Sequence, residues 1–343
     1  MSEPVLELEN LAISFRTPKG EVEAVRGVDL NVSAGEILCV VGESGSGKTV
    51  MCQSVMHLLP DYAYVKSGTM KVCGEDITQY SERQMRHIRG RNCSMVFQDP
   101  LTTLNPTIPI GKQIMEAIRK QENVSKEEAS RRALELLELV GIDDAAHRFQ
   151  LQPHFFSGGM RQRCVLAIAL ASNPKLLFAD EATTALDVTV EAKILDLLRE
   201  IRQKTGIAIV FISHDLGAVA RIADRVAVMY AGKIVEIGTA DEVFYDPRHP
   251  YTWGLLSSLP ALAAESGQLH PIPGMPPSLL DPPPGDAFAE RNEYALAIDY
   301  EQMPPMFPVS ETHFAATWLL DPRAPQVEPP IHLKAGSGIW TKT

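Results

Sequence analysis

The sequence predicts an α/β fold built around a buried and mostly parallel sheet. Four apolar runs of strand length alternate with helical stretches: ILCVV at 37–41, SMVF at 94–97, LLFA at 176–179 and IAIVFI at 207–212. Strands that are buried on both faces have this continuous apolar character, and helices between them favour a parallel arrangement. A Gly-rich segment directly after the first run is typical of the same fold class.

The composition is that of an ordinary globular protein. Of the 343 residues, 45% are hydrophobic and 22% are charged, which excludes a disordered chain. The net charge of −11 disfavours binding to nucleic acid through bulk charge. The longest apolar run, 165–171, is much shorter than a membrane-spanning helix, so we expect neither export nor a membrane span. Five cysteines without metal-binding spacing indicate reduced thiols.

The chain divides into a core, an insertion and a C-terminal part. The stretch 111–140 has no strand candidate, and Ser125 followed by Glu128 is typical of a helix start, so a helical insertion interrupts the α/β core. Seventeen of the 25 prolines occur from Pro247 onward. We therefore expect a Pro-rich linker at 259–285 and a small, loop-rich appendage at 286–343.

The Gly-rich segment GESGSGKT at 42–49 matches a phosphate-binding loop between a strand and a helix. Its glycines let backbone N–H groups turn inward at a helix N-terminus, which creates an anion site. Lys48 would reach the β- and γ-phosphates of ATP, and the Thr49 hydroxyl would bind Mg²⁺. The alternative is a Gly-rich turn with a solvated lysine. The predicted nucleotide-binding residues are Gly42, Glu43, Ser44, Gly45, Ser46, Gly47, Lys48 and Thr49.

A second polar site follows the apolar run at 176–179, where the sequence KLLFADE ends in two carboxylates. Functional sites of parallel sheets lie at such strand ends. Asp180 would hold Mg²⁺ through water, and Glu181 would polarise an attacking water molecule. A solvated pair of acids without a function is the alternative.

A third motif, FSGGM at 156–160 followed by RQR, opens a predicted helix at its Gly-Gly pair. It resembles the signature motif of ATP-binding cassette ATPases. Residues 42–49 then match that family's Walker A motif, and LLFADE matches its Walker B motif. The other matches, in family order, are Phe15 as the adenine-stacking aromatic, Gln98 in VFQDP as the Q-loop, TALD at 184–187 as the D-loop and His214 in ISHD as the switch histidine.

This resemblance implies a P-loop NTPase core of the cassette type over residues 1–258, with an antiparallel β edge and the helical insertion at about 99–170. Glu181 would be the general base, His214 would contact the γ-phosphate, and Gln98 would sense Mg²⁺ and water.

The implied metal-binding residues are Thr49, Gln98 and Asp180. Taken singly, Gln98 could be an exposed strand-end amide and His214 a buried core histidine. Their place among seven ordered motifs favours the functional interpretation. A lone Phe at a strand end is as often a core residue, so both interpretations of Phe15 stand.

The family resemblance also implies a head-to-tail dimer of ATPase domains. Each ATP would lie between the Walker motifs of one chain and the signature loop of the other, so that ATP binding closes the dimer and hydrolysis opens it. Hydroxyl and N–H groups at a helix N-terminus bind anions, so the signature loop of one chain could contact the γ-phosphate of ATP held by the other chain. The residues that would serve the partner's nucleotide are Ser157, Gly158, Gly159 and Asp187.

Longer strings resemble the oligopeptide and dipeptide import ATPases of bacteria, and more closely the first of their two paired subunits. They are FQDPLTTLNPTIPIG, FSGGMRQR, ATTALDVTVEAKIL and DEVFYDPRHPYTWGLLSSLP. One departure is Ala182, where that group usually has proline. The resemblance implies a paralogous second ATPase, two membrane permease subunits that dock near the helical insertion and Gln98, and indirectly an extracytoplasmic solute-binding protein. We expect a peripheral protein on the cytoplasmic face of the inner membrane.

The appendage resembles that group's C-terminal region, in which four cysteines commonly hold an iron–sulfur cluster. Residues around the pattern are retained, among them Phe288, Arg291 and His313. The positions of the cysteines are occupied by Asp286, Asn292, Asp299 and Thr317. Oxygen ligands do not replace four thiolates, so we predict that the chain holds no iron–sulfur cluster. A hard cation is the alternative, although the spacing matches no calcium loop.

Two functions of other classes compete with peptide import. A soluble cassette ATPase that acts in DNA repair or on ribosomes would usually have a long coiled-coil insertion or two cassettes, together with a basic surface. A binding-only regulator would have lost catalytic residues, whereas Lys48, Asp180, Glu181 and His214 are all present. We therefore expect an ATPase that powers a peptide importer, with ATP and Mg²⁺ as its cofactors and no nucleic acid as a partner.

Overall fold

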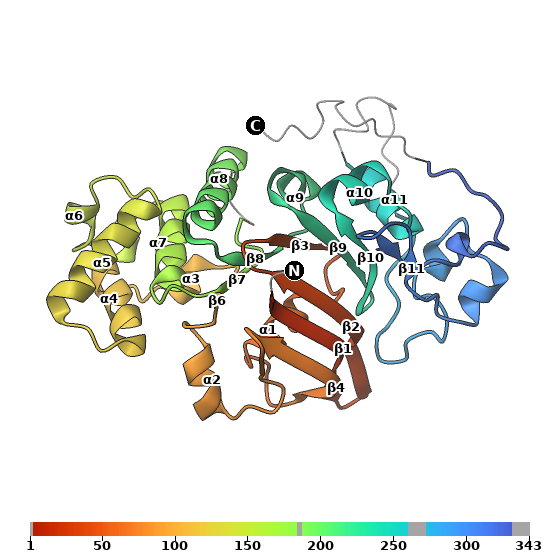
Figure 1. Ribbon diagram of the computed structural model, residues 1–343, viewed down its shortest axis with the longest axis horizontal. Helices are drawn as coiled ribbons and strands as arrows, with labels where there is room; N and C mark the ends of the chain where they lie inside the picture. Colours follow the sequence, from red (N-terminus) through yellow and green to blue (C-terminus); the bar gives the residue numbers. More distant parts are fainter. Residues whose placement is uncertain (1–2, 184–186, 260–271, 331–343) are drawn as a thin grey trace.

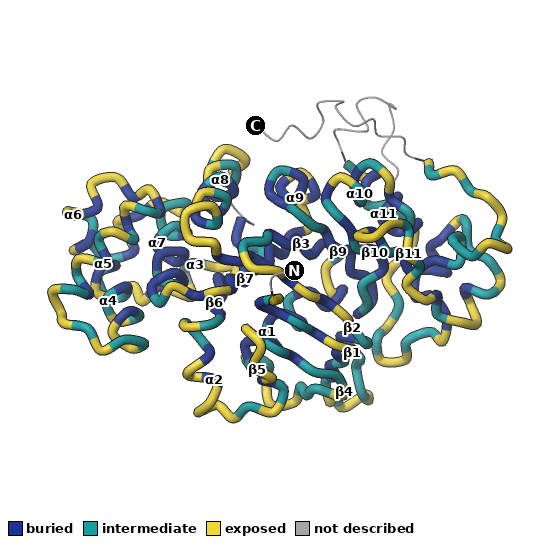
Figure 2. Tube along the Cα trace, viewed as in Figure 1, coloured by how far each residue is buried: buried dark blue, intermediate teal, exposed yellow. Residues whose placement is uncertain are grey.

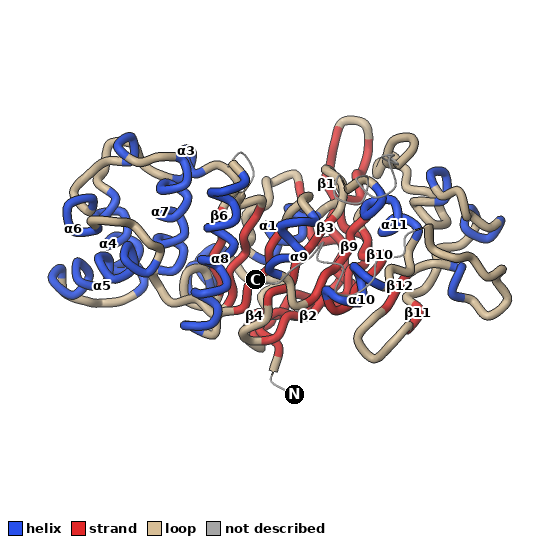
Figure 3. Tube along the Cα trace, turned by 90° about the horizontal axis from the view of Figure 1, so that it is seen from above, coloured by secondary structure: helices blue, strands red, loops and turns tan. Residues whose placement is uncertain are grey.

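The structure is a computed structural model that describes residues 3–183, 187–259 and 272–330. A central block of strands separates a lobe of helices from a C-terminal part that consists mostly of loops (Figures 1 and 3). The predicted α/β class is confirmed. Of the predicted linker at 259–285, the structure describes residues 259 and 272–285. Within the described ranges, no helix combines the length and apolar character needed to cross a membrane.

The main sheet has eight strands in the order β11-β12-β10-β9-β3-β8-β7-β6. Strands β9, β3, β8, β7 and β6 run parallel to one another, and β10 is antiparallel to β9. The four apolar runs are four of these strands, as the sequence predicts. The strands of this central part are β3 (Ile37–Val41), β6 (Cys93–Val96), β7 (Leu176–Asp180), β8 (Ala208–Ile212), β9 (Arg225–Tyr230) and β10 (Lys233–Thr239).

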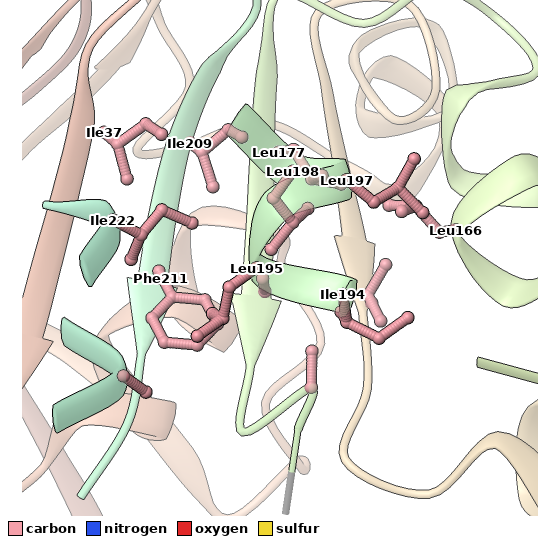
Figure 4. Close-up of a cluster of buried hydrophobic side chains, with 14 of the residues drawn as sticks. Ile37, Leu166, Leu177, Ile194, Leu195, Leu197, Leu198, Ile209, Phe211 and Ile222 are labelled. Atoms are coloured by element: carbon pink, nitrogen blue, oxygen red, sulfur yellow. The ribbon is translucent and has the colours of Figure 1, made fainter. Parts of the chain in front are cut away.

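Both faces of the main sheet are buried, because successive side chains of a strand point to opposite faces. Ile37, Cys39 and Val41 join one hydrophobic cluster, whereas Leu38 and Val40 join the other. Figure 4 shows the first cluster, in which Ile209 and Phe211 of β8 lie close to leucines of helix α8. Truncating one of these leucines to alanine would cost about 2–5 kcal/mol. The helices around the sheet are α1 (Lys48–Val55), α8 (Val188–Thr205) and α9 (Leu216–Ile222).

An antiparallel sheet in the order β2-β1-β4-β5 forms the implied β edge. Its inner side chains, such as Leu11 and Ile13, share the second hydrophobic cluster with Leu38 and Val40 of the main sheet. The apolar/polar alternation of PVLELENLAISF was a usable signal for β1 in the sequence. The elements of this region are β1 (Pro4–Thr17), β2 (Gly20–Ser33), β4 (Ala63–Val72), β5 (Glu75–Asp76) and α2 (Glu82–Ile88).

The helical insertion forms a separate lobe between β6 and β7. Ser125 caps helix α5 by accepting a hydrogen bond from the Glu128 N–H at 3.1 Å, as the sequence predicts. Helix α4 buries Ile110, Ile114 and Ile118, and α5 packs against it. Exposed and buried residues alternate along these helices in Figure 2. The helices are α3 (Pro100–Thr103), α4 (Ile110–Gln121), α5 (Lys126–Leu139), α6 (Ala145–Arg148) and α7 (Gly158–Leu170).

The C-terminal part adds two strands to the edge of the main sheet. In β12, Phe314 and Ala315 pair with Ile237 and Glu236 of β10. His313 Nε2 lies 2.7 Å from a Glu236 carboxylate oxygen, and both side chains are buried. The C-terminal part therefore packs on the main sheet itself. Its elements are α10 (Ala240–Tyr245), α11 (Pro250–Ser257), η2 (Ala289–Arg291), η3 (Ala297–Tyr300), β11 (Phe307–Pro308), β12 (Phe314–Ala315) and η4 (Trp318–Leu320).

Candidate active site

The segment 42–49 forms a tight loop between β3 and α1, at the carboxyl edge of the main sheet. Gly42 has φ 149° and Gly47 has φ 104°, and both values lie in a region that side chains rarely adopt. A Cβ on Gly42 would lie 2.1 Å from the Met229 carbonyl oxygen, and one on Gly47 would lie 2.4 Å from that of Ala24. These two glycines are therefore required by both conformation and space.

Lys48 is buried, and its ammonium group bridges the loop. Nζ donates hydrogen bonds to the carbonyl oxygens of Gly42 and Glu43, each at 2.8 Å, and to Ser46 Oγ at 3.3 Å. Burial lowers the pKa of Lys48, whereas the nearby carboxylates of Glu181, Asp180 and Glu43 raise it. The loop thus holds a cation at the place where the sequence predicts the phosphates.

Asp180 ends strand β7 and meets the first turn of α1. The Thr49 hydroxyl donates to Asp180 Oδ1 at 2.9 Å. Burial raises the pKa of Asp180, and the hydrogen bond from Thr49 opposes this shift. A hydroxyl and a carboxylate in contact are the hard oxygen donors that Mg²⁺ prefers, so these residues fit the predicted metal.

Glu181 lies at the centre of the predicted catalytic residues. Gln98 Nε2 donates to one carboxylate oxygen at 2.6 Å, and His214 Nδ1 lies 3.4 Å from the other. The three residues follow the ends of β6, β7 and β8, which are neighbours in the sheet. Glu181 has φ 46°, a left-handed conformation that is uncommon for glutamate and often found at functional sites. Gln98, Glu181 and His214 are thus brought together as the sequence analysis requires.

The signature loop is exposed on the helical lobe. Ser157 caps helix α7 by accepting from the Met160 N–H, and Gly158 is open to solvent. A Cβ on Gly159 would lie 2.5 Å from Val190 Cγ1, so this glycine permits the contact of α7 with α8. Asp187 is exposed and caps α8. Residues 184–186 of the D-loop lie outside the described residues.

Phe15 is half-buried on β1, where it pairs with Val22 and Ala63. Its ring centroid lies 5.9 Å from that of Tyr62. An exposed edge beside a second aromatic ring is compatible with base stacking and with a core role. The adenine-stacking role of Phe15 therefore stays a prediction.

Sequence reasoning missed the residues that hold Glu43. Its backbone N–H donates to the hydroxyl of Tyr251 at 2.7 Å, and its carboxylate forms an ion pair with Arg291 at 2.7 Å. Tyr251 and Arg291 both belong to the C-terminal part. The only signal in the sequence was that Arg291 is retained where the neighbouring cysteine positions are not.

The four residues at the expected cysteine positions are buried and bind local backbone. Each side chain has an oxygen that accepts from an N–H two or three residues away. Burial raises the pKa of Asp286 to about 6, and it also raises the pKa of Asp299. The acceptor residues and their donors are Asp286 with Phe288, Asn292 with Tyr294, Asp299 with Leu296 and Thr317 with Leu319. These contacts are turn caps, and the absence of an iron–sulfur cluster stays a prediction.

Known proteins are similar to this chain over nearly its whole length. A model of the ABC transporter family matches residues 25–184, and a model of the oligopeptide/dipeptide transporter C-terminal region matches residues 235–298. The oligopeptide transport ATP-binding protein OppD of Bacillus subtilis (strain 168) is 57% identical over 333 residues, which are 96% of this chain and 93% of that protein. The dipeptide transport ATP-binding protein DppD of Lactococcus lactis subsp. cremoris (strain MG1363) is 52% identical over 339 residues, 98% of this chain and 97% of that protein.

A solved structure has the same fold. It is the dimeric post-hydrolysis state of the ATP-binding cassette MJ0796 bound to ADP and Pi, with a TM-score of 0.62 and 26% identity. The match covers 68% of this chain and 98% of that chain. Fold and family model together define the present chain as an ATPase of the ATP-binding cassette class. Within that class it belongs to the family of oligopeptide and dipeptide transport ATP-binding proteins.

Proposed function

We propose that this chain hydrolyses ATP at the carboxyl edge of its main sheet and thereby powers the import of peptides or peptide-like solutes. One observation carries the proposal: the side chains of Gln98 and His214 both contact the Glu181 carboxylate. Glu181 is the residue after Asp180, which accepts a hydrogen bond from Thr49. The peptide class of solute is supported by the names of the relatives and by the matched C-terminal region.

In the proposed mechanism, Glu181 acts as the general base. Its carboxylate accepts a proton from the attacking water, and the oxygen of that water forms a bond to the γ-phosphorus while the bond to the β-phosphate oxygen breaks. Gln98 and His214 orient the carboxylate, since each contacts a different one of its oxygens. The ammonium group of Lys48, which donates to loop carbonyl oxygens in this structure, would bind the phosphates of ATP.

Thr49, Asp180 and Gln98 are the residues that would hold Mg²⁺. Bound there, the ion would neutralise charge on the β- and γ-phosphates. Asp180 contributes a carboxylate whose burial disfavours its charge, and a nearby cation would compensate that cost.

The composite site of a dimer follows from the exposed signature loop. Ser157, Gly158 and Gly159 would contact the γ-phosphate of ATP bound to the Walker motifs of a second, paralogous subunit, with Asp187 close by. Exposure of Ser157 and Gly158 leaves them accessible to that subunit. ATP would close the dimer because it makes contacts with both chains, and hydrolysis would remove them.

Two membrane permease subunits would complete the transporter, with a solute-binding protein outside the membrane delivering the solute. The helical lobe has a cavity of about 840 Å³ that combines Met115 and Phe149 with charged residues such as Arg119. This cavity is where we place the contact with a permease. The chain would then lie on the cytoplasmic face of the inner membrane.

The test is transport itself. The chain is co-expressed with the genes that neighbour it, the complex is purified from membranes, and uptake of a labelled oligopeptide into proteoliposomes is measured with and without ATP. We expect ATP-dependent uptake that the Lys48→Ala variant abolishes. ATPase activity that is stimulated by DNA or ribosomes, without membrane subunits in the complex, would instead establish the soluble alternative.

A further inference from the structure

The second residue of the phosphate loop is held by the C-terminal part of the chain. Arg291 donates from Nη1 to Glu43 Oε2 at 2.7 Å and from Nη2 to Glu43 Oε1 at 2.9 Å. A planar guanidinium that binds both oxygens of a carboxylate fixes its orientation as well as its charge. The Tyr251 hydroxyl accepts from the Glu43 backbone N–H at 2.7 Å. Both the side chain and the backbone of Glu43 are therefore positioned from outside the loop.

Arg291 is itself immobilised. Its side chain is 5% exposed, and its Nε donates to the carbonyl oxygen of Pro273 at 2.7 Å. Nη1 also donates to the Tyr230 hydroxyl at 3.1 Å, and the guanidinium lies 5.9 Å from the ring centroid of Phe288. One side chain thus joins the linker, the end of strand β9, the appendage and the phosphate loop.

The charge of Glu43 acts on the place where phosphates would bind. Its backbone carbonyl accepts from Lys48 Nζ, and its carboxylate is close enough to raise the pKa of Lys48. Without its ion pair, the Glu43 carboxylate would repel the polyphosphate of ATP bound to the same loop, because charges in a partly buried site are weakly screened. Arg291 supplies the opposite charge at 2.7 Å and removes that repulsion.

We propose that Arg291 is a positioning residue that makes the ATP affinity of the phosphate loop depend on the folding of the C-terminal segment, residues 272–330. The segment would neutralise Glu43 and hold the first turn of the loop in shape. Detachment of the segment, by a partner or by unfolding, would then lower ATP affinity without changing the contacts among Gln98, Glu181 and His214. This inference rests on the proposed assignment of residues 42–49 to phosphate binding.

The test compares ATP binding to purified full-length variants by calorimetry in the presence of Mg²⁺. Arg291→Ala should raise the Kd for ATP by on the order of tenfold. Arg323→Ala is the matched control, because it removes the same charge from an exposed ion pair with Asp321 in the same segment. Its Kd should stay within about twofold of the unsubstituted chain.

A double variant separates the electrostatic effect from a loss of structure. Glu43→Gln combined with Arg291→Ala removes both charges, so it should recover most of the lost ATP affinity. The midpoint of thermal unfolding should remain as low as in Arg291→Ala, because the buried contacts of Arg291 are still missing. Arg291→Lys keeps a charge without the two-pronged geometry, and its Kd should be intermediate.

Two results would overturn the inference: equal ATP affinity in Arg291→Ala and Arg323→Ala, or no recovery in the double variant. Lys48→Ala distinguishes this failure from a wrong assignment of the loop. If Lys48→Ala loses ATP binding and Arg291→Ala does not, residues 42–49 still bind phosphate and only the role of Arg291 is wrong. If Lys48→Ala also binds ATP normally, the assignment of the loop fails.

Discussion

The carboxyl edge of the main sheet, which holds the proposed catalytic residues, and the C-terminal segment use the same kind of side chain in different surroundings. At the edge, Glu181 is 23% exposed and its carboxylate meets the side chains of Gln98 and His214. In the C-terminal segment, Asp286 and Asp299 are 4% and 2% exposed, and each accepts from a nearby backbone N–H. A carboxylate that faces solvent and other side chains can take part in a reaction, whereas one that caps a buried turn stabilises a loop.

The largest effect that this comparison predicts is for Glu181→Gln. Glutamine keeps the size of the side chain but cannot accept the proton of the attacking water, so ATP turnover at this chain's own site should fall by about 10²–10⁴-fold. ATP binding should persist, because Lys48 and the loop are unchanged. Steady-state ATPase assays on an assembled complex in which the partner ATPase has lost its own general base measure the turnover, and calorimetry of the purified chain measures ATP binding.

Lys48→Ala is the companion variant, and it should lose ATP binding together with turnover. Substantial turnover at this chain's own site in Glu181→Gln would mean that another group is the base. The carboxylate at the catalytic edge would then have the same structural role as those of the C-terminal segment.

The second effect concerns the exposed signature loop. A Cβ on Gly158 would meet no atom within 4 Å, so Gly158→Asp should fold normally while placing a negative charge against the partner's γ-phosphate. In a complex whose chain also carries Glu181→Gln, the remaining turnover should come from the partner's site. Adding Gly158→Asp should reduce that remainder by at least about tenfold.

Asn173→Asp is the control for Gly158→Asp, because it adds the same negative charge at an exposed position shortly after helix α7. The composite-site proposal is wrong if both variants leave the partner's turnover intact, or if a strictly monomeric preparation has full activity.

Most of the residues that meet at the carboxyl edge of the main sheet could be predicted from the sequence, because the signals for them are local. The loop GESGSGKT, or a strand that ends at Asp180 and is followed by Glu181, is visible within eight residues of sequence. The cap of Ser125 is equally local and was predicted correctly. The contact of Arg291 with Glu43 joins residues 248 positions apart, and no periodicity or spacing encodes such a pair. Its existence depends on tertiary packing, in which Arg291 is held by Pro273 and by Tyr230 of β9.

A smaller effect is expected for Asp286→Asn. The pKa of Asp286 is raised to about 6 by burial, above about 3.9 in an unfolded chain. The protonated form is therefore favoured in the folded state, and its contribution to stability is present below about pH 4 and lost as the pH rises towards 6. Asparagine stays neutral and keeps the oxygen that caps Phe288. At pH 7 the variant should be more stable by on the order of 2 kcal/mol, a gain that disappears near pH 4.

Hydrogen exchange of the amides at 286–300, followed from pH 4 to pH 8, measures this difference. Glu290→Gln is the control, because it neutralises an exposed carboxylate in the same segment. A stability difference that does not change with pH would show that Asp286 is ionised throughout in the folded chain.

The smallest expected effect is that of removing iron, because we predict that the chain holds no iron–sulfur cluster. The four positions at which the family resemblance implies cysteines hold oxygen-bearing side chains that act as turn caps. The five cysteines of the chain all lie between Cys39 and Cys164, in the ATPase core, and four of them are buried apart from the C-terminal segment. Iron in such clusters requires thiolates, so the segment must keep its shape through the caps and through the Glu43 and Glu236 contacts.

Anaerobic purification followed by iron and sulfide analysis should find no stoichiometric metal, and unfolding should be unchanged by an iron chelator. A brown protein whose C-terminal segment loosens when iron is removed would show that the caps are not what holds this segment together.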